Sequence, residues 1–243
     1  MYYESTRNRN IKKNFSEVLL KGLAEDGGLY IPKKWVKFSN KDFKKFERMT
    51  YHEMAFHISK RFIGKEIKDT DLKRIITKSL KNFSNKDIAT LKNLSDNEWL
   101  LELYHGPTLA FKDYALQIVG NLFDYILKKT NKKITIIGAT SGDTGSAAID
   151  GCKKKNTMEV FIFHPLKKIS NIQRRLMTTV KEKNIHNIAL KGNFDDCQRI
   201  VKKLFVDKDL ENKFNFSAIN SINWSRILFQ TIYYFFCISR IKN

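Results

Sequence analysis

The apolar residues in the first third of the chain recur three or four positions apart, which is typical of helices that bury one face. Residues 15–23 follow this spacing, and so do residues 42–83, with breaks near Gly64 and Asp69. Short runs with strand character flank the first helix, at positions 2–7 and 29–32. Pro32 ends the second run, because proline cannot donate to a strand ladder. The pattern therefore predicts a mostly helical N-terminal region.

Strands and helices alternate in the rest of the chain. Four apolar runs predict strands at residues 99–104, 134–137, 160–163 and 187–190. Helices are predicted at residues 114–127, 146–152 and 170–179, in the stretch that ends at Val206, and across residues 227–238. Such alternation is typical of an α/β fold around a parallel sheet. Because the polar residues 82–98 connect the two patterns, we expect one domain over residues 1–90 and another over residues 91–243.

Polar side chains at the predicted helix starts are candidates for N-caps, because their oxygens accept hydrogen bonds from the first free N–H groups of a helix. Ser170 has this position in its helix, and Thr108 has it ahead of residues 114–127. For the helix that ends at Val206 the candidates are Asp195 and Asp196. For both aspartates a capping role is favoured over a chemical one.

The composition is that of a globular protein, with 42% apolar and 12% aromatic residues among 243. The formal net charge is +20, a balance found in proteins that bind nucleic acids or anionic membranes. The basic residues are spread along the chain among Asn, Ile and Phe, and no recognisable nucleic-acid module accompanies them. A composition bias therefore explains the charge better than a nucleic-acid partner does.

Cysteine and histidine spacing predicts neither a disulfide framework nor a metal site. The three cysteines are far apart and odd in number, and His52 and His57 lie five positions apart, off a common helical face. The N-terminus is polar, unlike a secretory signal, and the apolar run at residues 227–238 is too short to span a bilayer. We therefore expect a soluble, cytoplasmic protein with no metal and no membrane partner.

Glycine and proline set turn geometry and are scarce here, with 11 and 3 residues respectively. Gly106 and Pro107 nevertheless lie just before Lys112. Four glycines share one short window: Gly138, Gly142, Gly145 and Gly151. Within it, residues 139–145 form a loop of small and hydroxyl side chains between a β-branched strand and a helix. That order of elements is used to hold anions at a helix N-terminus.

Lys112 lies at or just before the start of a predicted helix. The positive end of a helix dipole disfavours an ammonium group and favours the neutral amine. A neutral amine is what attack on a carbonyl group requires. Asp113 opposes this effect if its side chain points the same way, and the sequence leaves that direction open. The alternative is an ordinary surface lysine, in a chain with 45 Lys and Arg.

A last polar group precedes the apolar helix at residues 227–238. It consists of Asn220, Ser221, Asn223 and Arg226. A guanidinium is well suited to a phosphate or carboxylate, so these residues are candidates for binding an anionic substrate. The same amides and hydroxyl also serve as helix caps, which is the alternative that the residues alone leave open.

Several of these segments together resemble the threonine synthases, pyridoxal-phosphate enzymes of the tryptophan-synthase-β fold type. HGPTLAFKD at residues 105–113 resembles the family's cofactor-lysine segment, and ATSGDTGSAA at residues 139–148 resembles the loop that follows the lysine helix. NSINWSRI at residues 220–227 is similar to a third family segment, with Ser225 in place of Ala. The likeness covers nearly the whole chain in colinear order, and is far more specific than a lone glycine-rich loop.

The resemblance implies the fold, the cofactor and the reaction. The fold would be the three-layer parallel-sheet fold of type II pyridoxal-phosphate enzymes, preceded by a mostly helical domain. The reaction would convert O-phosphohomoserine and water to threonine and phosphate. Lys112 would bond the cofactor and move protons on the substrate. Ser141, Gly142, Asp143 and Thr144 would face the cofactor. The substrate would be bound by Thr108, Asn220, Ser221, Asn223 and Arg226.

One departure from the family pattern limits what is expected of this chain. A second glycine-rich loop, which cradles the cofactor phosphate in the family, has no counterpart in order before Asn243. We therefore expect a truncated fold, weak cofactor binding and little turnover, unless a partner chain supplies the rest. A homo-oligomer is the other assembly expected. The alternatives are a related lyase, such as a serine or threonine dehydratase, a non-catalytic remnant, and, least favoured, a nucleic-acid binder.

Overall fold

The structure of the chain is a computed structural model that describes residues 1–219 and 222–241. Its helices are α1 (Phe15–Lys21), α2 (Asn40–Phe46), α3 (Tyr51–Ile63), α4 (Asp69–Leu80), α5 (Asp113–Thr130), α6 (Asp143–Cys152), α7 (Asn171–Thr178), α8 (Phe194–Val206), α9 (Lys208–Phe214) and α10 (Trp224–Arg240). Its strands are β1 (Tyr3–Ser5), β2 (Tyr30–Pro32), β3 (Thr90–Ser95), β4 (Glu98–Glu102), β5 (Ile134–Ala139), β6 (Met158–Pro165), β7 (Ile185–Leu190) and β8 (Phe216–Ser217).

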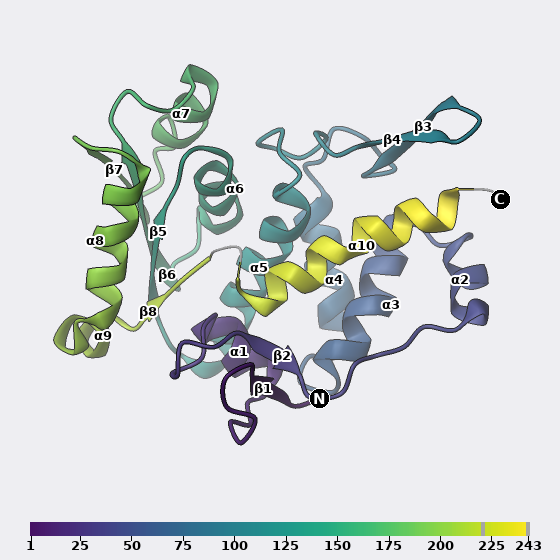
Figure 1. Cartoon of the computed structure of the whole chain (residues 1–243), viewed down its shortest axis with the longest axis horizontal. Coiled ribbons are helices and arrows are strands. Elements are labelled where there is room, and N and C mark those ends of the chain that lie inside the picture. Colours follow the sequence, from purple (N-terminus) through teal and green to yellow (C-terminus); the bar gives the residue numbers. More distant parts are fainter. Residues whose placement is uncertain (220–221, 242–243) are drawn as a thin grey trace.

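A four-stranded parallel sheet in the order β7-β6-β5-β8 forms the middle layer of the second half of the chain. Successive strand residues point to opposite faces of a sheet. Ile136 and Val160 are paired in register, and their side chains pack in the large core on one face. Those of Ile137 and Phe163 therefore pack in a smaller core on the other face. Helices α6 and α7 lie on one side of the sheet and α8 on the other (Figure 1), which confirms the predicted three-layer α/β fold.

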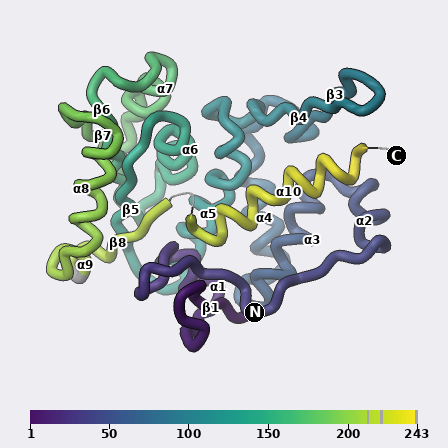
Figure 2. Tube along the Cα trace, in the orientation of Figure 1, coloured from purple at the N-terminus to yellow at the C-terminus, as the bar shows by residue number. Residues whose placement is uncertain are grey.

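The first half of the chain packs as helices against α5 and α10. Helix α10 runs beside α2, α3 and α5 (Figures 1 and 2), so the last described helix closes the N-terminal helical layer. Three buried tyrosines mark the junction. The ring centroid of Tyr114 in α5 lies 5.8 Å from that of Tyr51 in α3 and 6.0 Å from that of Tyr233 in α10. The predicted helical region and its two short strands are confirmed.

Two glycines bring α5 and α6 into unusually close contact. A Cβ atom added to Gly120 would lie 2.2 Å from the backbone oxygen of Gly151, and one added to Gly151 would lie 2.5 Å from the backbone oxygen of Leu116. Real side chains do not approach a backbone this closely, so both positions require glycine. The contact holds the helix that follows Lys112 against the helix that follows the small-residue loop.

The strand predicted at residues 99–104 exists as β4 but lies outside the parallel sheet. It pairs antiparallel with β3, a strand that lies in the segment predicted to be a polar connection. The side chains of β3 are partly or fully exposed. Because most side chains of β3 are exposed, this strand leaves no apolar pattern in the sequence, whereas β4 was predicted from its apolar run. The alternation toward the parallel sheet therefore begins at β5.

Four helix starts, one helix and one strand also differ from expectation. Helices α6 and α10 begin at Asp143 and Trp224, each three residues earlier than predicted, and α9 was not predicted. The N-cap of α8 is Asn193, which forms a capping box with Asp196, so neither candidate aspartate is the cap. A further break before α3, capped by Thr50, divides residues 42–83, and the two-residue strand β8 was not predicted. Ser170 caps α7 as predicted. The division at residue 90 stays a prediction.

Candidate active site

A compact turn delivers Lys112 to the start of α5. Asp113 accepts hydrogen bonds from the backbone N–H and the hydroxyl of Thr108, both at 2.8 Å. Leu109, between them, has a φ of +58°, a left-handed conformation that is costly for a branched apolar residue. Lys112 is the N-cap residue of α5, and no side chain caps this helix, so the prediction of Thr108 as its cap is wrong.

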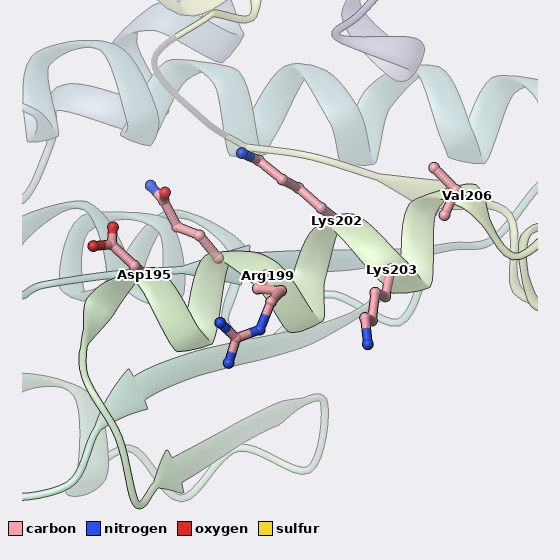
Figure 3. Close-up of a pocket in the computed structure, with 6 residues that line it drawn as sticks. Asp195, Arg199, Lys202, Lys203 and Val206 are labelled. Atoms are coloured by element: carbon pink, nitrogen blue, oxygen red, sulfur yellow. The ribbon is translucent and has the colours of Figure 1, made fainter.

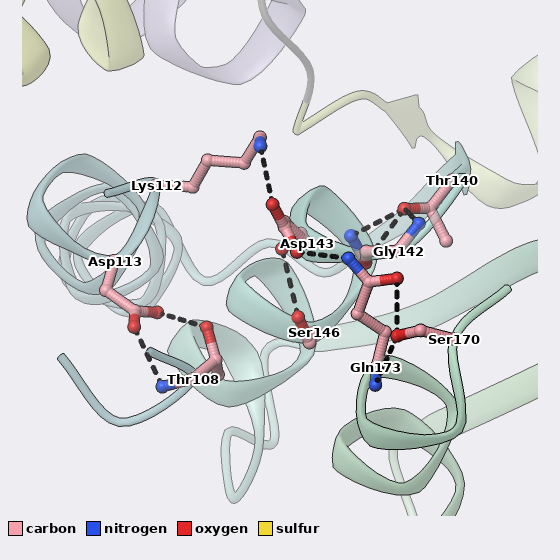
Figure 4. A network of polar contacts seen from close by, with 10 residues as sticks. Thr108, Lys112, Asp113, Thr140, Gly142, Asp143, Ser146, Ser170 and Gln173 are labelled. Carbon is pink, nitrogen blue, oxygen red and sulfur yellow. Dashed lines mark hydrogen bonds and ion pairs between the residues drawn. The ribbon is translucent and has the colours of Figure 1, made fainter. Parts of the chain in front are cut away.

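The Asp113 carboxylate points away from the Lys112 amine, which answers a question that the sequence left open. The two side chains leave the start of α5 in different directions, Asp113 toward Thr108 and Lys112 toward Asp143 (Figure 4). Asp113 is fully buried. Burial raises the pKa of its carboxyl to about 6, although the hydrogen bonds from Thr108 act in the opposite direction.

Lys112 is paired with Asp143, the first residue of α6. Its Nζ lies 3.3 Å from Asp143 Oδ2 and 4.4 Å from the centre of the Phe111 ring. The side chain of Lys112 is 16% exposed and that of Asp143 is 40% exposed. The amine is therefore partly withdrawn from solvent and lies at the loop that the sequence predicted as its neighbour.

The loop between β5 and α6 is held by its own threonine. Thr140 Oγ1 accepts hydrogen bonds from the backbone N–H groups of Gly142, at 3.0 Å, and Gly145, at 2.9 Å. Gly142 has a φ of +151°, and a Cβ atom there would lie 2.4 Å from the side chain of Gln173. Glycine is therefore required at this position. Ser141 is exposed, and Asp143 and Thr144 are partly buried.

The start of α6 offers donors to an anion. In an α-helix the first N–H groups have no acceptor within the helix. Here they belong to Asp143 and Thr144, since the N–H of Gly145 already donates to Gly142 O and Thr140 Oγ1. Together with the positive end of the helix dipole, these groups suit a phosphate or a carboxylate.

Gln173, in α7, is a site residue that the sequence did not reveal. Its Nε2 donates to Asp143 Oδ1, and its Oε1 accepts from the hydroxyl of Ser170 at 2.9 Å (Figure 4). The sequence signals were the position of Gln173 three residues after a predicted helix cap, which also fits a purely structural role, and the similarity of residues 170–179 to a family segment.

Two of the predicted substrate residues use their polar groups within the fold. The hydroxyl of Thr108 is bonded to Asp113 on the other side of the α5 start from the Lys112 amine (Figure 4). Asn223 is fully buried as the N-cap of α10, where it accepts from Ser225 N–H and donates to Leu19 O, both at 2.9 Å. The local structure therefore favours the capping alternative for Asn223.

Arg226, in the first turn of α10, is the predicted residue with an unused buried polar atom. Its side chain is 5% exposed, and its Nε has no hydrogen-bond partner among residues 1–219 and 222–241. Burial lowers the pKa of its guanidinium. A buried cation gains most from an anionic partner. Within those ranges, Arg226 forms no hydrogen bond or ion pair with Asp143, the carboxylate that is paired with Lys112. The two remaining candidates, Asn220 and Ser221, lie outside the described residues.

Two surface hollows differ in how they relate to this site. One is lined partly by Pro107 and Thr108, from the turn before Lys112, and by Asp150 and Lys153, at the end of α6. The other, on the exposed side of α8, is lined by Asp195, Gln198, Arg199, Lys202, Lys203 and Val206 (Figure 3). In the part of the chain that the structure describes, no group of three or more Asp, Glu, His or Cys side chains is arranged to hold a metal ion. None of the described helices combines the length and apolar character needed to cross a membrane.

Two family models match the chain in succession. Residues 2–80 match the threonine synthase N terminus, and residues 83–234 match the family of pyridoxal-phosphate-dependent enzymes. Among curated proteins, the threonine synthase of Pseudomonas aeruginosa is 48% identical over 235 residues, which cover 97% of this chain and 50% of the relative. The threonine synthase of Saccharomyces cerevisiae is 44% identical, with 99% and 50% covered.

Solved structures agree with these sequence matches. A pyridoxal-phosphate-bound threonine synthase from Brucella melitensis superposes with a TM-score of 0.93 at 40% identity, covering 98% of this chain and 52% of that one. The yeast threonine synthase superposes with a TM-score of 0.91 at 42% identity, covering 98% and 50%. The chain therefore spans about half the length of the threonine synthases it matches.

Proposed function

The chain belongs to the pyridoxal-phosphate-dependent enzymes, and on this premise we propose that it binds pyridoxal phosphate through Lys112 as part of a threonine synthase. The reaction proposed is the conversion of O-phosphohomoserine and water to threonine and phosphate. The observation that carries the proposal is the 3.3 Å pairing of Lys112 Nζ with Asp143 Oδ2, which joins the two motifs most similar to those of the family.

The residues around Lys112 fit the cofactor chemically. An amine that is partly withdrawn from water can bond an aldehyde, and its neighbour Asp143 can store or accept a proton. Free N–H groups at the start of α6 suit an anionic group. Because Gly142 has no Cβ, the side chain of Gln173 can pack directly against the loop backbone there. We assign cofactor contacts to Ser141, Gly142, Asp143 and Thr144.

The chain's own groups would perform three tasks in this reaction. Lys112 Nζ would carry protons to and from the substrate carbons, since it is the amine nearest the loop. The first N–H groups of α6 would hold the substrate carboxylate. Arg226 would hold the substrate phosphate, because its buried guanidinium has an Nε without a partner in the described residues. The bound cofactor supplies an electron sink.

We expect this chain by itself to bind the cofactor weakly and to turn over slowly. The family's second glycine-rich loop would normally anchor the cofactor phosphate, and no such loop stands in order in this sequence. Gly192 and Asn193, which resemble it superficially, lie at the start of α8, where Asn193 serves as the N-cap. A polypeptide segment that supplies that loop, in the same protein or in a partner chain, would complete the site. A homo-oligomer is a separate assembly that we also propose. The cytoplasm is the compartment we propose.

A spectroscopic titration with two substrates tests the proposal. Pyridoxal phosphate added to the chain should give a visible absorption band that Lys112→Ala lacks and Lys128→Ala retains, because Lys128 is a solvent-exposed residue of the same helix. O-phosphohomoserine should perturb this band and serine should not. Phosphate release should stay far below the range of about 1–1000 per second found for enzymes.

Each contrary result has a distinct meaning. Equal bands in the wild-type chain and Lys112→Ala would refute cofactor binding at Lys112 and favour a non-catalytic remnant. A response to serine and not to O-phosphohomoserine would favour the related dehydratases. Phosphate release at an ordinary enzyme rate would show that the chain needs no further polypeptide.

A further inference from the structure

The side chain of Gln173 extends from α7 toward the pair formed by Lys112 and Asp143. An ionised carboxylate only accepts hydrogen bonds, so the amide NH₂ of Gln173 must face Asp143 Oδ1. The amide oxygen then faces Ser170, whose hydroxyl donates to it at 2.9 Å. Ser170 Oγ in turn accepts the backbone N–H of Gln173 at 3.2 Å. Both ends of the Gln173 amide are therefore fixed.

The backbone of the loop limits where the Gln173 side chain can go. Its Cδ, Oε1 and Nε2 atoms all lie within 2.5 Å of the point where a Cβ of Gly142 would stand. The side chain therefore packs directly on the residue before Asp143. This contact joins α7 to the start of α6, directly before Asp143.

Each oxygen of the Asp143 carboxylate has its own partner. Oδ1 accepts from Gln173, and Oδ2 lies 3.3 Å from Lys112 Nζ. A carboxylate with one oxygen held cannot rotate freely, so the position of Oδ2 depends on Gln173. We propose that Gln173 is a positioning residue that aims Asp143 at Lys112 and so keeps the reactive amine of Lys112 in its ion pair. This inference rests on the proposed role of Lys112.

The charged groups around Lys112 make Asp143 the relevant partner. On α5, the Asp113 carboxylate is turned to Thr108. On α6, Asp150 is paired with Lys153 and accepts from Gln117 at 3.0 Å. Gln173, from α7, is uncharged. Among the described residues, Asp143 is the carboxylate that forms an ion pair with Lys112.

A double-mutant cycle on the chain without cofactor tests the inference. The readout is the rate at which acetic anhydride acylates Lys112, followed by peptide mapping between pH 6 and 10, with Lys128 in the same digest as the reference. Gln173→Met keeps the length of the side chain but removes the donor. It should raise the Lys112 rate at pH 8 about two- to threefold, because a loosened Asp143 leaves the Lys112 amine unpaired more of the time.

The cycle separates positioning from a general structural effect. Asp143→Asn should raise the rate by a larger factor, and Gln173→Met should add no further change in that background. Ser170→Ala should act in the same direction as Gln173→Met, more weakly, and it provides the same test if Gln173→Met fails to fold. Gln198→Met, on α8, is the matched control and should leave the Lys112 profile unchanged.

Two results would overturn the inference. One is an unchanged Lys112 profile in folded Gln173→Met, and the other is an equal effect of this substitution with and without Asp143. Because no pyridoxal phosphate is added, failure of the proposed function would appear in the cofactor titration and would leave this measurement unaffected.

Discussion

At the scale of single residues, the direction of each side chain decides the chemistry. The sequence predicted Lys112 and the loop at residues 139–145, because their turn residues cluster and their order is typical of anion-binding starts of helices. It did not predict that Asp113 turns toward Thr108, nor that Gln173 reaches Asp143 from α7. Both depend on tertiary contacts that leave no periodic pattern in the chain.

The buried Asp113 carboxyl should make stability depend on pH. Its pKa is raised from 3.8 to about 6, so the folded state binds more protons than the unfolded state between these values. The stability that this group contributes is present at low pH and is lost as pH rises from about 4 to 6. The loss should be on the order of 3 kcal/mol, from about 1.4 kcal/mol per pKa unit.

Urea unfolding of the wild-type chain and Asp113→Asn at several pH values measures this effect. The difference in the free energy of unfolding between the two proteins should change by about 3 kcal/mol between pH 3 and 7 and stay constant at higher pH. Asp96→Asn, at an exposed turn between β3 and β4, is the control and should show no such change. If the difference in the free energy of unfolding between the wild-type chain and Asp113→Asn did not change with pH, the prediction that burial raises the pKa of this carboxyl would be wrong.

At the scale of elements, helices were predicted more reliably than the partners of strands. The apolar spacing of α5 and the β-branched run of β5 are local signals, so both were found within a few residues. Strand β4 was also predicted, but β3 and its pairing with β4 were not, because the hairpin is held by its backbone ladder and by Glu102. That carboxylate accepts hydrogen bonds from Thr90 and Tyr104 and pairs with Lys92, which lowers its pKa to about 2.

The contact between α5 and α6 gives a prediction with an unusual sign. Replacing glycine by alanine inside a helix normally stabilises it by about 0.5–1 kcal/mol. Gly120→Ala should instead destabilise the chain by about 3 kcal/mol or more, because the new Cβ would lie 2.2 Å from Gly151 O. Thermal or urea unfolding measures the change.

Gly138→Ala is the matched control for this substitution. The Cβ added there would meet only the end of the Ile162 side chain, at 3.3 Å, which can shift. We expect a change of less than about 1 kcal/mol. Similar stabilities for Gly120→Ala and the wild-type chain would mean that α5 and α6 are farther apart than described here.

At the scale of the whole molecule, the fold class was predicted but the order of the sheet was not. Alternating strands and helices require a parallel sheet, whereas the order β7-β6-β5-β8 depends on which faces the helices cover. The short strand β8 pairs with β5 and follows α8 in the chain, the helix that covers one face of the sheet (Figure 1). The chain spans about half the length of the threonine synthases it matches and contains the segment around Lys112.

The most direct test of the central claim is reduction of the mixture of chain and pyridoxal phosphate with borohydride, followed by peptide mapping. We predict a pyridoxyl group on the peptide that contains Lys112, lost in Lys112→Ala and retained in Lys128→Ala. A label spread over the exposed lysines, with Lys112 modified no more than the others, would contradict the proposal that this amine holds the cofactor.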